Sequence, residues 1–360
     1  MRKLKHGTKI ICAMSGGVDS SVAAAILKKD GLNVIGVFMK FWAEPEKNSL
    51  IGAWNRCCSP EAENRARKVA SILDIPFYVF NFEKEFKKKI VDYFLIEYEK
   101  GRTPNPCVVC NKEIKFGLLL EKTLSLGRDY IATGHYARIQ RKKERICLLK
   151  VKDKEKDQSY FLWQLNQEQL KRILFPIGNF TKNQVRNLAK KFKLPVLNIP
   201  ESQEICFIQT TINDFLERHL KTKTGKIVDI EGKTIGQHQG LYFYTIGQRK
   251  GIKLAGGPFY VLDKNFEKNF LIVTKNEKDL YKKELIAENV NWISGKIPKL
   301  PLKVKTKIRY RHVASAATIY PPIPNTKYKI LFKRPQRAIT PGQSVVFFKG
   351  QEVLGGGIIC

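Results

Sequence analysis

Long apolar runs are missing from this sequence of 360 residues, although 43% of its residues are hydrophobic. No stretch approaches the roughly 20 apolar residues that a membrane-spanning helix requires, and neither a signal-peptide core nor a cleavage site follows the basic start at 1–6. Internal repeats and low-complexity linkers are also missing. We therefore expect a cytoplasmic protein with no membrane segment and with about two or three domains.

Acidic residues are few, because 33 Asp and Glu stand against 65 Lys and Arg, a formal net charge of +32. Such an excess favours a polyanionic partner, and nucleic acid is the first candidate. The alternative is a lysine-rich chain whose charge is mostly solvated surface. The segment Lys303–Arg311 alternates cations with apolar or small residues, as one face of a strand would. A solvent-exposed edge strand protected by lysine would have the same pattern.

The most informative motif is Ser15-Gly16-Gly17-Val18-Asp19-Ser20, between apolar runs suited to a strand (10–14) and a helix (22–27). This arrangement directs backbone N–H groups and a helix N-terminus toward an anion. The loop lacks the lysine of the G-x-x-x-x-G-K-[ST] phosphate loop, so ordinary γ-phosphoryl transfer is not indicated. It resembles instead the pyrophosphate loop of the N-type ATP pyrophosphatases, which cleave ATP to AMP and pyrophosphate and adenylate a substrate.

The first half of the chain alternates apolar strands with amphipathic helices, which predicts an α/β fold with a parallel sheet covered on both faces. Ligands on such sheets bind beyond the carboxyl ends of the strands, where Ser15, Met39 and Gly134 are expected. From Phe207 onward short β-rich runs dominate. We predict a catalytic domain at 1–208, a small β-rich central domain at 209–283 and a C-terminal β-barrel of about six strands at 284–360.

The cysteine spacing C-x-x-C occurs once, at Cys107 and Cys110, after the rigid loop Pro104-Asn105-Pro106. The prolines bar helix through Pro106, so we expect a helix to begin at Cys110 or Asn111. A thiol at a helix N-terminus, near Lys112 and Arg102, should have a lowered pKa and be nucleophilic. Half of a zinc site is the alternative, but a second C-x-x-C or an H-x-x-x-H is missing.

The other cysteines carry weaker signals. Taken alone, Cys206 fits a buried core cysteine. The adjacent pair Cys57-Cys58 fits a passive surface pair, with a docking point for a sulfur donor as the weaker alternative.

Several further segments resemble the motifs of one protein family and occur in the same order as in that family. They are Lys156–Phe161, Glu201–Ile208, Thr245–Gly251 and Thr340–Ser344, together with the two motifs above. From about Lys9 to Ile359 the chain resembles the bacterial tRNA-specific 2-thiouridylases. This resemblance implies an adenine nucleotide α-hydrolase-like catalytic domain, a β-rich central domain and a C-terminal β-barrel that binds tRNA.

The resemblance also implies a reaction. ATP adenylates the 2-carbonyl oxygen of the wobble uridine in tRNAs for Lys, Glu and Gln, because that oxygen does not leave unaided. Sulfur from a cysteine persulfide then replaces it. The persulfide comes from a sulfur-donor protein, either a cysteine desulfurase or a relay protein.

Individual residues acquire roles from the resemblance alone. Cys206 matches the family's persulfide carrier, and Cys110 matches its nucleophile. ATP, with Mg²⁺ offsetting its charge, is assigned to Ala13, Met14, Ser15, Gly16, Gly17, Val18, Asp19, Ser20, Met39 and Gly134. The tRNA contacts are assigned to Asn105, Pro106 and Cys107 at the target base and to His135, Lys156, Asp157, Gln158, Arg309, Tyr310 and Gln343. Asp19 could either contact Mg²⁺ or fix the loop.

Cys107 departs from the best-known branch of the family, which has an aspartate there that is thought to act as general acid and base. A thiol can replace it only if its pKa lies near neutrality. The cysteine also allows an alternative mechanism, in which Cys107, Cys110 and Cys206 hold an iron–sulfur cluster. A persulfide relay between Cys206 and Cys110 is our prediction, and the cluster is its alternative.

Two other functions compete with tRNA thiolation. One is activation of a small molecule, as in asparagine, argininosuccinate, NAD or GMP synthetases, which would need neither the cysteine pair nor a basic C-terminal barrel. The other is a catalytically inert RNA-binding protein, which would not need an intact loop together with both cysteines.

Overall fold

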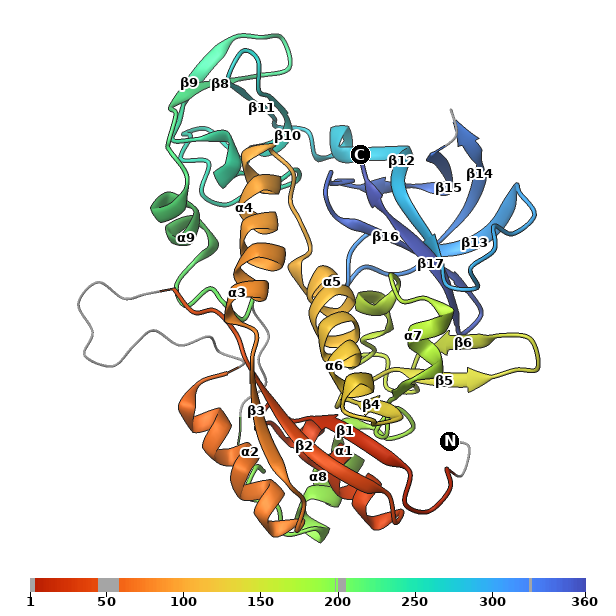
Figure 1. Cartoon of the computed structure of the whole chain (residues 1–360). Helices are drawn as coiled ribbons and strands as arrows, with labels where there is room; N and C mark the ends of the chain where they lie inside the picture. The colour runs from red at the N-terminus through yellow and green to blue at the C-terminus, as the bar shows by residue number, and fades with distance from the viewer. Residues whose placement is uncertain (1–3, 45–57, 198, 200–204, 324–325) are drawn as a thin grey trace.

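The computed structural model describes residues 4–44, 58–197, 199, 205–323 and 326–360. Its strands form a five-stranded, a four-stranded and an eight-stranded sheet. Figure 1 shows the five-stranded sheet at the bottom, the four-stranded sheet at the upper left and the eight-stranded sheet at the right. In the described part of the chain no helix has the length and apolar character needed to cross a membrane.

The first sheet is parallel and has the order β3-β2-β1-β4-β7. Its strands are β1 (Lys9–Ala13), β2 (Asn33–Lys40), β3 (Phe77–Asn81), β4 (Tyr130–Ala132) and β7 (Ile173–Leu174). In register, Ile11 of the central strand lies between Ile35 and Ile131. Strands buried on both faces are apolar throughout, and Ile10, Ile11 and Cys12 are at most 1% exposed.

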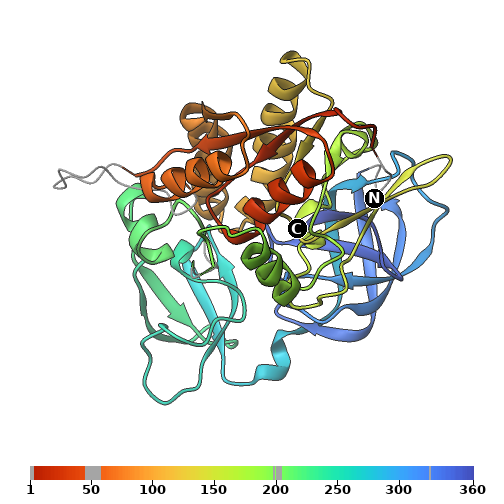
Figure 2. The ribbon, with the colours of Figure 1, turned by 90° about the horizontal axis from the view of Figure 1, so that it is seen from below.

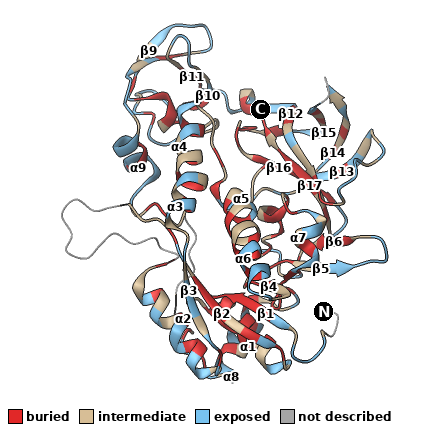
Figure 3. Cartoon of the chain, in the orientation of Figure 1, coloured by how far each residue is buried: buried red, intermediate tan, exposed pale blue. Residues whose placement is uncertain are grey.

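Helices cover both faces of this sheet, as the alternating pattern predicts (Figures 1 and 3). On one face lie α1 (Val18–Lys29), α2 (Pro60–Ile72) and α8 (Lys182–Lys191). On the other lie α5 (Pro106–Cys110), a π-helical stretch (Asn111–Leu118) and α6 (Leu119–Ser125). A further helical segment consists of α3 (Glu83–Phe86), a π-helical stretch (Lys87–Val91) and α4 (Asp92–Glu99). Short helices η3 (Ser159–Leu162) and α7 (Gln167–Lys171) follow later in the chain.

The central region begins with α9 (Ile212–His219), whose N-terminus carries a capping box of Thr211 and Asp214. Its sheet has the order β10-β11-β8-β9. The strands are β8 (Gly225–Val228), β9 (Thr234–His238), β10 (Tyr260–Asn265) and β11 (Phe270–Thr274), with short helices η4 (Leu241–Phe243) and η5 (Glu277–Leu280) after β9 and β11.

The last six strands form a closed β-barrel, because β12 pairs with β15 on one side and with β17 on the other. They are β12 (Tyr281–Trp292), β13 (Leu302–Lys307), β14 (Ser315–Ile323), β15 (Lys327–Arg337), β16 (Ser344–Lys349) and β17 (Glu352–Ile359). The predicted barrel is confirmed. Sequence analysis missed that a hairpin from the first half of the chain, β5 (Arg138–Arg141) and β6 (Ile146–Leu149), extends the same sheet beside β17.

One alternative for the basic segment is wrong. Strand β13 pairs with β14 and with β16, so it is not an edge strand. It ends at Lys307, and the following residues Arg309–Arg311 lie in a turn rather than in the expected longer strand. Lys303 and Lys305 are nevertheless exposed on one face, as the alternation predicts, while Val304 is buried.

The central region and the barrel lie side by side against the same side of the first domain (Figures 1 and 2). Helix α4 and the loop that leads to α5 run between them (Figure 1). Buried polar contacts join the barrel to the first domain: the Trp163 indole N–H donates to Ser344 Oγ (3.0 Å), and the Asn291 amide donates to the Trp163 carbonyl (2.7 Å).

Candidate active site

The loop after β1 is folded around the hydroxyl group of Ser20. The Ser15 N–H donates to Ser20 Oγ (3.2 Å), and this hydroxyl donates to the Gly17 carbonyl (3.2 Å). Gly16 adopts φ +74°, and a Cβ there would lie 2.2 Å from the Ala62 carbonyl oxygen, so only glycine suits this position. Helix α1 begins after Gly17 without a side-chain cap, which leaves its first turn suited to an anion.

Gly134 lies directly against this first turn. A Cβ on Gly134 would be 2.6 Å from the Ser20 nitrogen, so the chain after β4 can approach α1 this closely only through a glycine. The structure therefore brings Gly134 together with Asp19 and Ser20. By contrast, three neighbouring apolar residues belong to the core: Ala13, Met14 and Val18 are 7%, 1% and 6% exposed. Met39 is half-buried and packs against two core clusters.

Asp19 is held by two side chains that sequence analysis missed. Lys182 Nζ lies 2.8 Å from both carboxylate oxygens of Asp19, and the Tyr136 hydroxyl donates to one of them (2.7 Å). The Lys182 side chain is only 8% exposed, and that of Asp19 is 30% exposed. In this structure Asp19 thus fixes the loop to α8. No local sequence pattern marks Lys182, which is the first residue of an ordinary capped helix.

One group of tRNA candidates in the first domain, residues 156–158, contacts Tyr136 through Gln158. The Gln158 side chain accepts the Tyr136 N–H (2.9 Å), while Asp157 is buried and accepts the Ser159 N–H (3.2 Å). Lys156 is half-buried beside them. Because Tyr136 also contacts Asp19, the segment 156–158 is connected to the loop after β1 through a single residue.

His135 is packed among aromatic rings. Its ring centroid lies 5.7 Å from that of Phe116 and 6.0 Å from that of Phe175, and its Nδ1 lies 2.7 Å from Thr133 Oγ1. Burial, with a smaller contribution from the charge of Lys115, lowers the pKa of His135 well below 6.5. The imidazole is therefore neutral at pH 7.

The cysteine helix α5 begins at Pro106, so the expectation of a start at Cys110 or Asn111 is wrong. Proline is well suited to the first helical position, where its missing N–H would have no partner inside the helix. Cys107 consequently lies in the first turn and is exposed, whereas Cys110 closes the α5 segment and is 8% exposed. The π-helical stretch starts directly after Cys110, and π-helical turns are frequent at functional sites.

The cations expected to activate the thiols are paired with carboxylates. Arg102 contacts Glu97 (2.7 Å) and Glu288 (3.2 Å), and Lys112 Nζ lies 3.5 Å from Glu113. The charges of Arg102 and Lys112 are therefore partly offset by neighbouring carboxylates.

Cys206 is half-buried and packs against the core cluster that contains Cys110. Its neighbour Phe207 is fully buried, with its ring edge toward that of Phe94 (5.3 Å). Within the described residues, no three His, Cys, Asp or Glu side chains are grouped to hold a metal ion. Cys107, Cys110 and Cys206 are thus not grouped as three metal ligands among these residues.

Of the adjacent cysteines Cys57 and Cys58, the structure describes only the second. Cys57 lies outside the described residues, whereas Cys58 is buried and its sulfur accepts the Phe41 N–H (3.2 Å). The expectation of a surface pair is therefore wrong for Cys58.

Of the three tRNA candidates in the barrel, Tyr310 and Gln343 contact the first domain. Arg309 is half-buried and donates to the Ala338 carbonyl and to Thr340 Oγ1 (3.1 Å). Tyr310 packs with its ring centroid 4.5 Å from that of Phe161. The Gln343 amide donates to the Thr103 carbonyl (2.8 Å), on the loop that leads to the cysteines.

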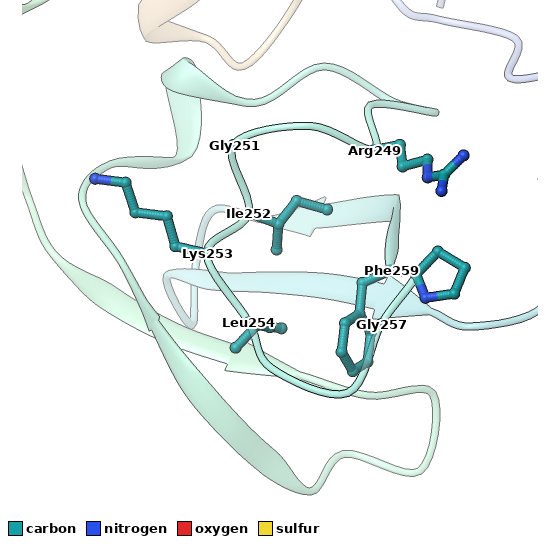
Figure 4. Close-up of a pocket in the computed structure, with 8 residues that line it drawn as sticks. Arg249, Gly251, Ile252, Lys253, Leu254, Gly257 and Phe259 are labelled. Atoms are coloured by element: carbon teal, nitrogen blue, oxygen red, sulfur yellow. The ribbon is translucent and has the colours of Figure 1, made fainter.

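Two cavities lie away from these residues. One, of about 610 Å³, includes Leu4, Arg138, Ile173 and Phe175 in its lining. The other, of about 370 Å³, is in the central region (Figure 4), where Arg249 and Lys253 point away from one another. Its lining consists of Arg249, Gly251, Ile252, Lys253, Leu254, Gly257, Pro258 and Phe259. Neither lining includes the α1 loop or a cysteine.

The fold and the α1 loop define a nucleotide-binding domain of the HUP class, followed by two β-rich domains. Family models match in the same order: "tRNA methyl transferase HUP domain" at residues 8–210, "tRNA methyl transferase PRC-barrel domain" at 213–275 and "Aminomethyltransferase beta-barrel domain" at 282–359. The chain belongs to the family of the tRNA-specific 2-thiouridylases. It is 48% identical to such a protein from Acetivibrio thermocellus over 357 residues, which are 98% of this chain and 99% of that one.

Other relatives are equally similar. A tRNA-specific 2-thiouridylase of Clostridioides difficile is 47% identical, covering 98% of both chains, and one of Carboxydothermus hydrogenoformans is 47% identical, covering 98% of this chain and 97% of that one. Among solved structures, a 4-thiouridine synthetase–RNA complex with bound ATP superimposes at a TM-score of 0.35, with 18% identity over 59% of this chain and 50% of that one. An NMN synthetase of Francisella tularensis reaches a TM-score of 0.34, with 17% identity over 58% of this chain and 72% of that one.

Proposed function

We propose that this protein is a tRNA-uridine 2-sulfurtransferase that uses ATP to thiolate the wobble uridine of tRNA. The observation that carries the proposal is the match to tRNA-specific 2-thiouridylases over 98% of the chain. The intact α1 loop and the cysteines Cys110 and Cys206 fit the two halves of such a reaction. Activation of a small molecule would leave both cysteines and the basic barrel without a role.

ATP binds at the N-terminus of α1. Backbone N–H groups of the Ser15–Ser20 loop hold the phosphates, and Gly134 leaves room beside the helix. Lys182 adds a buried cation next to this turn. Mg²⁺ would be held mainly by the ATP phosphates, because it commonly takes only one or two protein carboxylates. Asp19, in the first turn of α1, would supply such a carboxylate.

The reaction has two steps. In the first, the uridine O2 attacks the α-phosphorus of ATP, and pyrophosphate leaves, so that O2 becomes part of an AMP leaving group. In the second, the outer sulfur of a Cys206 persulfide attacks C2 and AMP leaves. Cys110 then attacks the inner sulfur, which frees the 2-thiouridine and leaves a Cys110–Cys206 disulfide for an external thiol to reduce.

Cys107 and its neighbours Asn105 and Pro106 contact the target base, which must leave its stack to reach the loop. Cys107 is exposed in the first turn of α5 and takes the place of a general acid and base. A persulfide-donor protein loads Cys206. Because tRNA and ATP are both cytoplasmic, we infer a cytoplasmic location.

The test is single-turnover thiolation of tRNA with a persulfide donor, read as 2-thiouridine by mass spectrometry. Cys110→Ser and Cys206→Ser should each abolish the product, while both variants should still release pyrophosphate, because adenylation needs neither thiol. Cys147→Ser, in buried strand β6, is the matched control and should retain activity. Retained thiolation in either test variant would remove that cysteine from the reaction.

A further inference from the structure

The loop between α4 and α5, residues 101–105, leads directly into α5, which carries Cys107 and Cys110. Hydrogen bonds from another domain hold this loop. Up to Arg102 the backbone is tied to the end of α4, because the Gly101 and Arg102 N–H groups donate to the carbonyls of Tyr98 and Glu97. Pro104 and Pro106 have no N–H to donate. The backbone groups of Thr103 and Pro104 therefore depend on partners elsewhere.

The barrel supplies these partners from one short segment, Pro341–Ser344. The Thr103 N–H donates to the Pro341 carbonyl (2.9 Å), and the Gln343 amide donates to the carbonyls of Thr103 (2.8 Å) and Pro104 (3.4 Å). The Tyr160 hydroxyl, which hydrogen-bonds the Asn105 side chain, donates to the Ser344 carbonyl (2.9 Å). Both halves of the loop are thus joined to the same barrel segment.

The approach of the two backbones is close enough to require glycine. Gly342 adopts φ +88°, and a Cβ there would lie 2.9 Å from both the Arg102 Cβ and the Thr103 nitrogen. Arg102 reinforces the contact by bridging Glu97 of α4 and Glu288 of β12. The central region touches the same loop, since Thr103 Oγ1 lies 3.3 Å from Thr245 Oγ1.

We propose that the barrel segment Pro341–Ser344 positions the cysteine loop for catalysis, and that Gln343 is a positioning residue rather than a tRNA contact. The amide nitrogen of Gln343 is committed to the loop carbonyls. Because α5 begins at Pro106, a shift of residues 103–105 moves Cys107 and the start of α5 with it. This inference rests on the proposed role of the cysteines in thiolation.

Two variants test the contact in different ways. Gln343→Ala removes the amide, whereas Gly342→Ala removes no polar group and pushes the two backbones apart. The matched control is Gly350→Ala, because Gly350 also has a positive φ (+58°) in the barrel but nothing lies within 4 Å of its added Cβ. Gln343→Ala and Gly342→Ala should lower kcat for thiolation about tenfold or more, because misplacing a reacting group by about 1 Å can cost a hundredfold. Their Kd for tRNA should change less than threefold, and the control should match the wild type.

Alkylation gives a readout that does not depend on activity. Iodoacetamide labelling of the tRNA-free protein, followed by peptide sequencing, compares Cys110 with exposed Cys107 in the same peptide and with buried Cys147. Labelling of Cys110 should rise severalfold in both variants, relative to Cys107, while Cys147 stays protected. If Cys110→Ser retained thiolation, the proposed function would fail, but the labelling result would still test the contact.

Three outcomes would overturn the inference. A tenfold weaker Kd for tRNA in Gln343→Ala, with kcat unchanged at saturating tRNA, would make Gln343 a tRNA contact. Unchanged kcat and labelling in Gly342→Ala would show that the contact does not position the loop. Equal increases in labelling at Cys110 and Cys147 would show that the segment stabilises the chain as a whole.

Discussion

Replacing Lys182 by methionine should both destabilise the folded protein and weaken ATP binding. The change keeps the length and apolar stem of the side chain and removes only its charge. In the ATP-free protein it leaves Asp19 with the Tyr136 hydroxyl as its remaining described partner. Breaking a fully buried pair costs about 3–5 kcal/mol. Because Asp19 is 30% exposed and keeps a hydrogen bond, we expect about 2 kcal/mol here.

The effect on ATP follows from the charge that remains. Without Lys182, the Asp19 carboxylate faces the incoming phosphates uncompensated. Two like charges about 4 Å apart repel by about 4 kcal/mol at an effective dielectric constant of about 20. Partial exposure reduces this, so we expect the Kd for a non-hydrolysable ATP analogue to rise at least about tenfold, which corresponds to about 1.4 kcal/mol.

The double variant Asp19→Asn/Lys182→Met provides the decisive comparison. It removes both charges, so it should bind the analogue more tightly than Lys182→Met alone and should show coupling in a double-mutant cycle. Lys190→Met, exposed on the same helix α8, is the control and should match the wild type. Calorimetric titration gives the Kd, and urea unfolding without nucleotide gives the stability. An analogue Kd within threefold of wild type for Lys182→Met, or no recovery in the double variant, would refute the reasoning.

Two further predictions concern pH and salt. Burial lowers the pKa of His135 below 6.5, so its contribution to stability is present above pH 6.5 and is lost as pH falls from there toward the folded-state pKa. In His135→Gln the free energy of unfolding should therefore fall less steeply between pH 6.5 and 5, by up to about 1.4 kcal/mol per pH unit, and an unchanged slope in urea titrations would contradict this. The affinity for tRNA should decrease linearly on a log–log plot against salt, and Lys303→Ala or Lys305→Ala should each reduce that slope by about one if the exposed face of β13 contacts phosphates. A slope that neither variant alters would assign binding to other basic surfaces.

Local patterns in the sequence predict most of the framework. The apolar run at 10–14 identifies β1, and the small-residue loop identifies the start of α1. The capping box at Thr211 predicts the first turn of α9. Prolines are usually helix breakers, which predicts a later start for α5, whereas Pro106 occupies the one helical position that proline favours. In each of these cases the determining interactions lie within about one turn of the residue concerned.

The residues that sequence analysis missed, or assigned differently, act across large distances along the chain. Lys182 meets Asp19 over a separation of 163 residues, and Gln343 meets Thr103 over 240. Neither partner carries a local signal, because a lysine at the start of a capped helix and a glutamine in a barrel turn are ordinary surface choices. Burial gives these side chains their effect. Removing a solvated ammonium group from an ion pair costs little stability, whereas removing one that is 8% exposed beside a carboxylate is strongly destabilising. The α1 loop and the loop before α5 can thus each be recognised from their own residues. The side chains that hold these loops in place can be identified only from the packed structure.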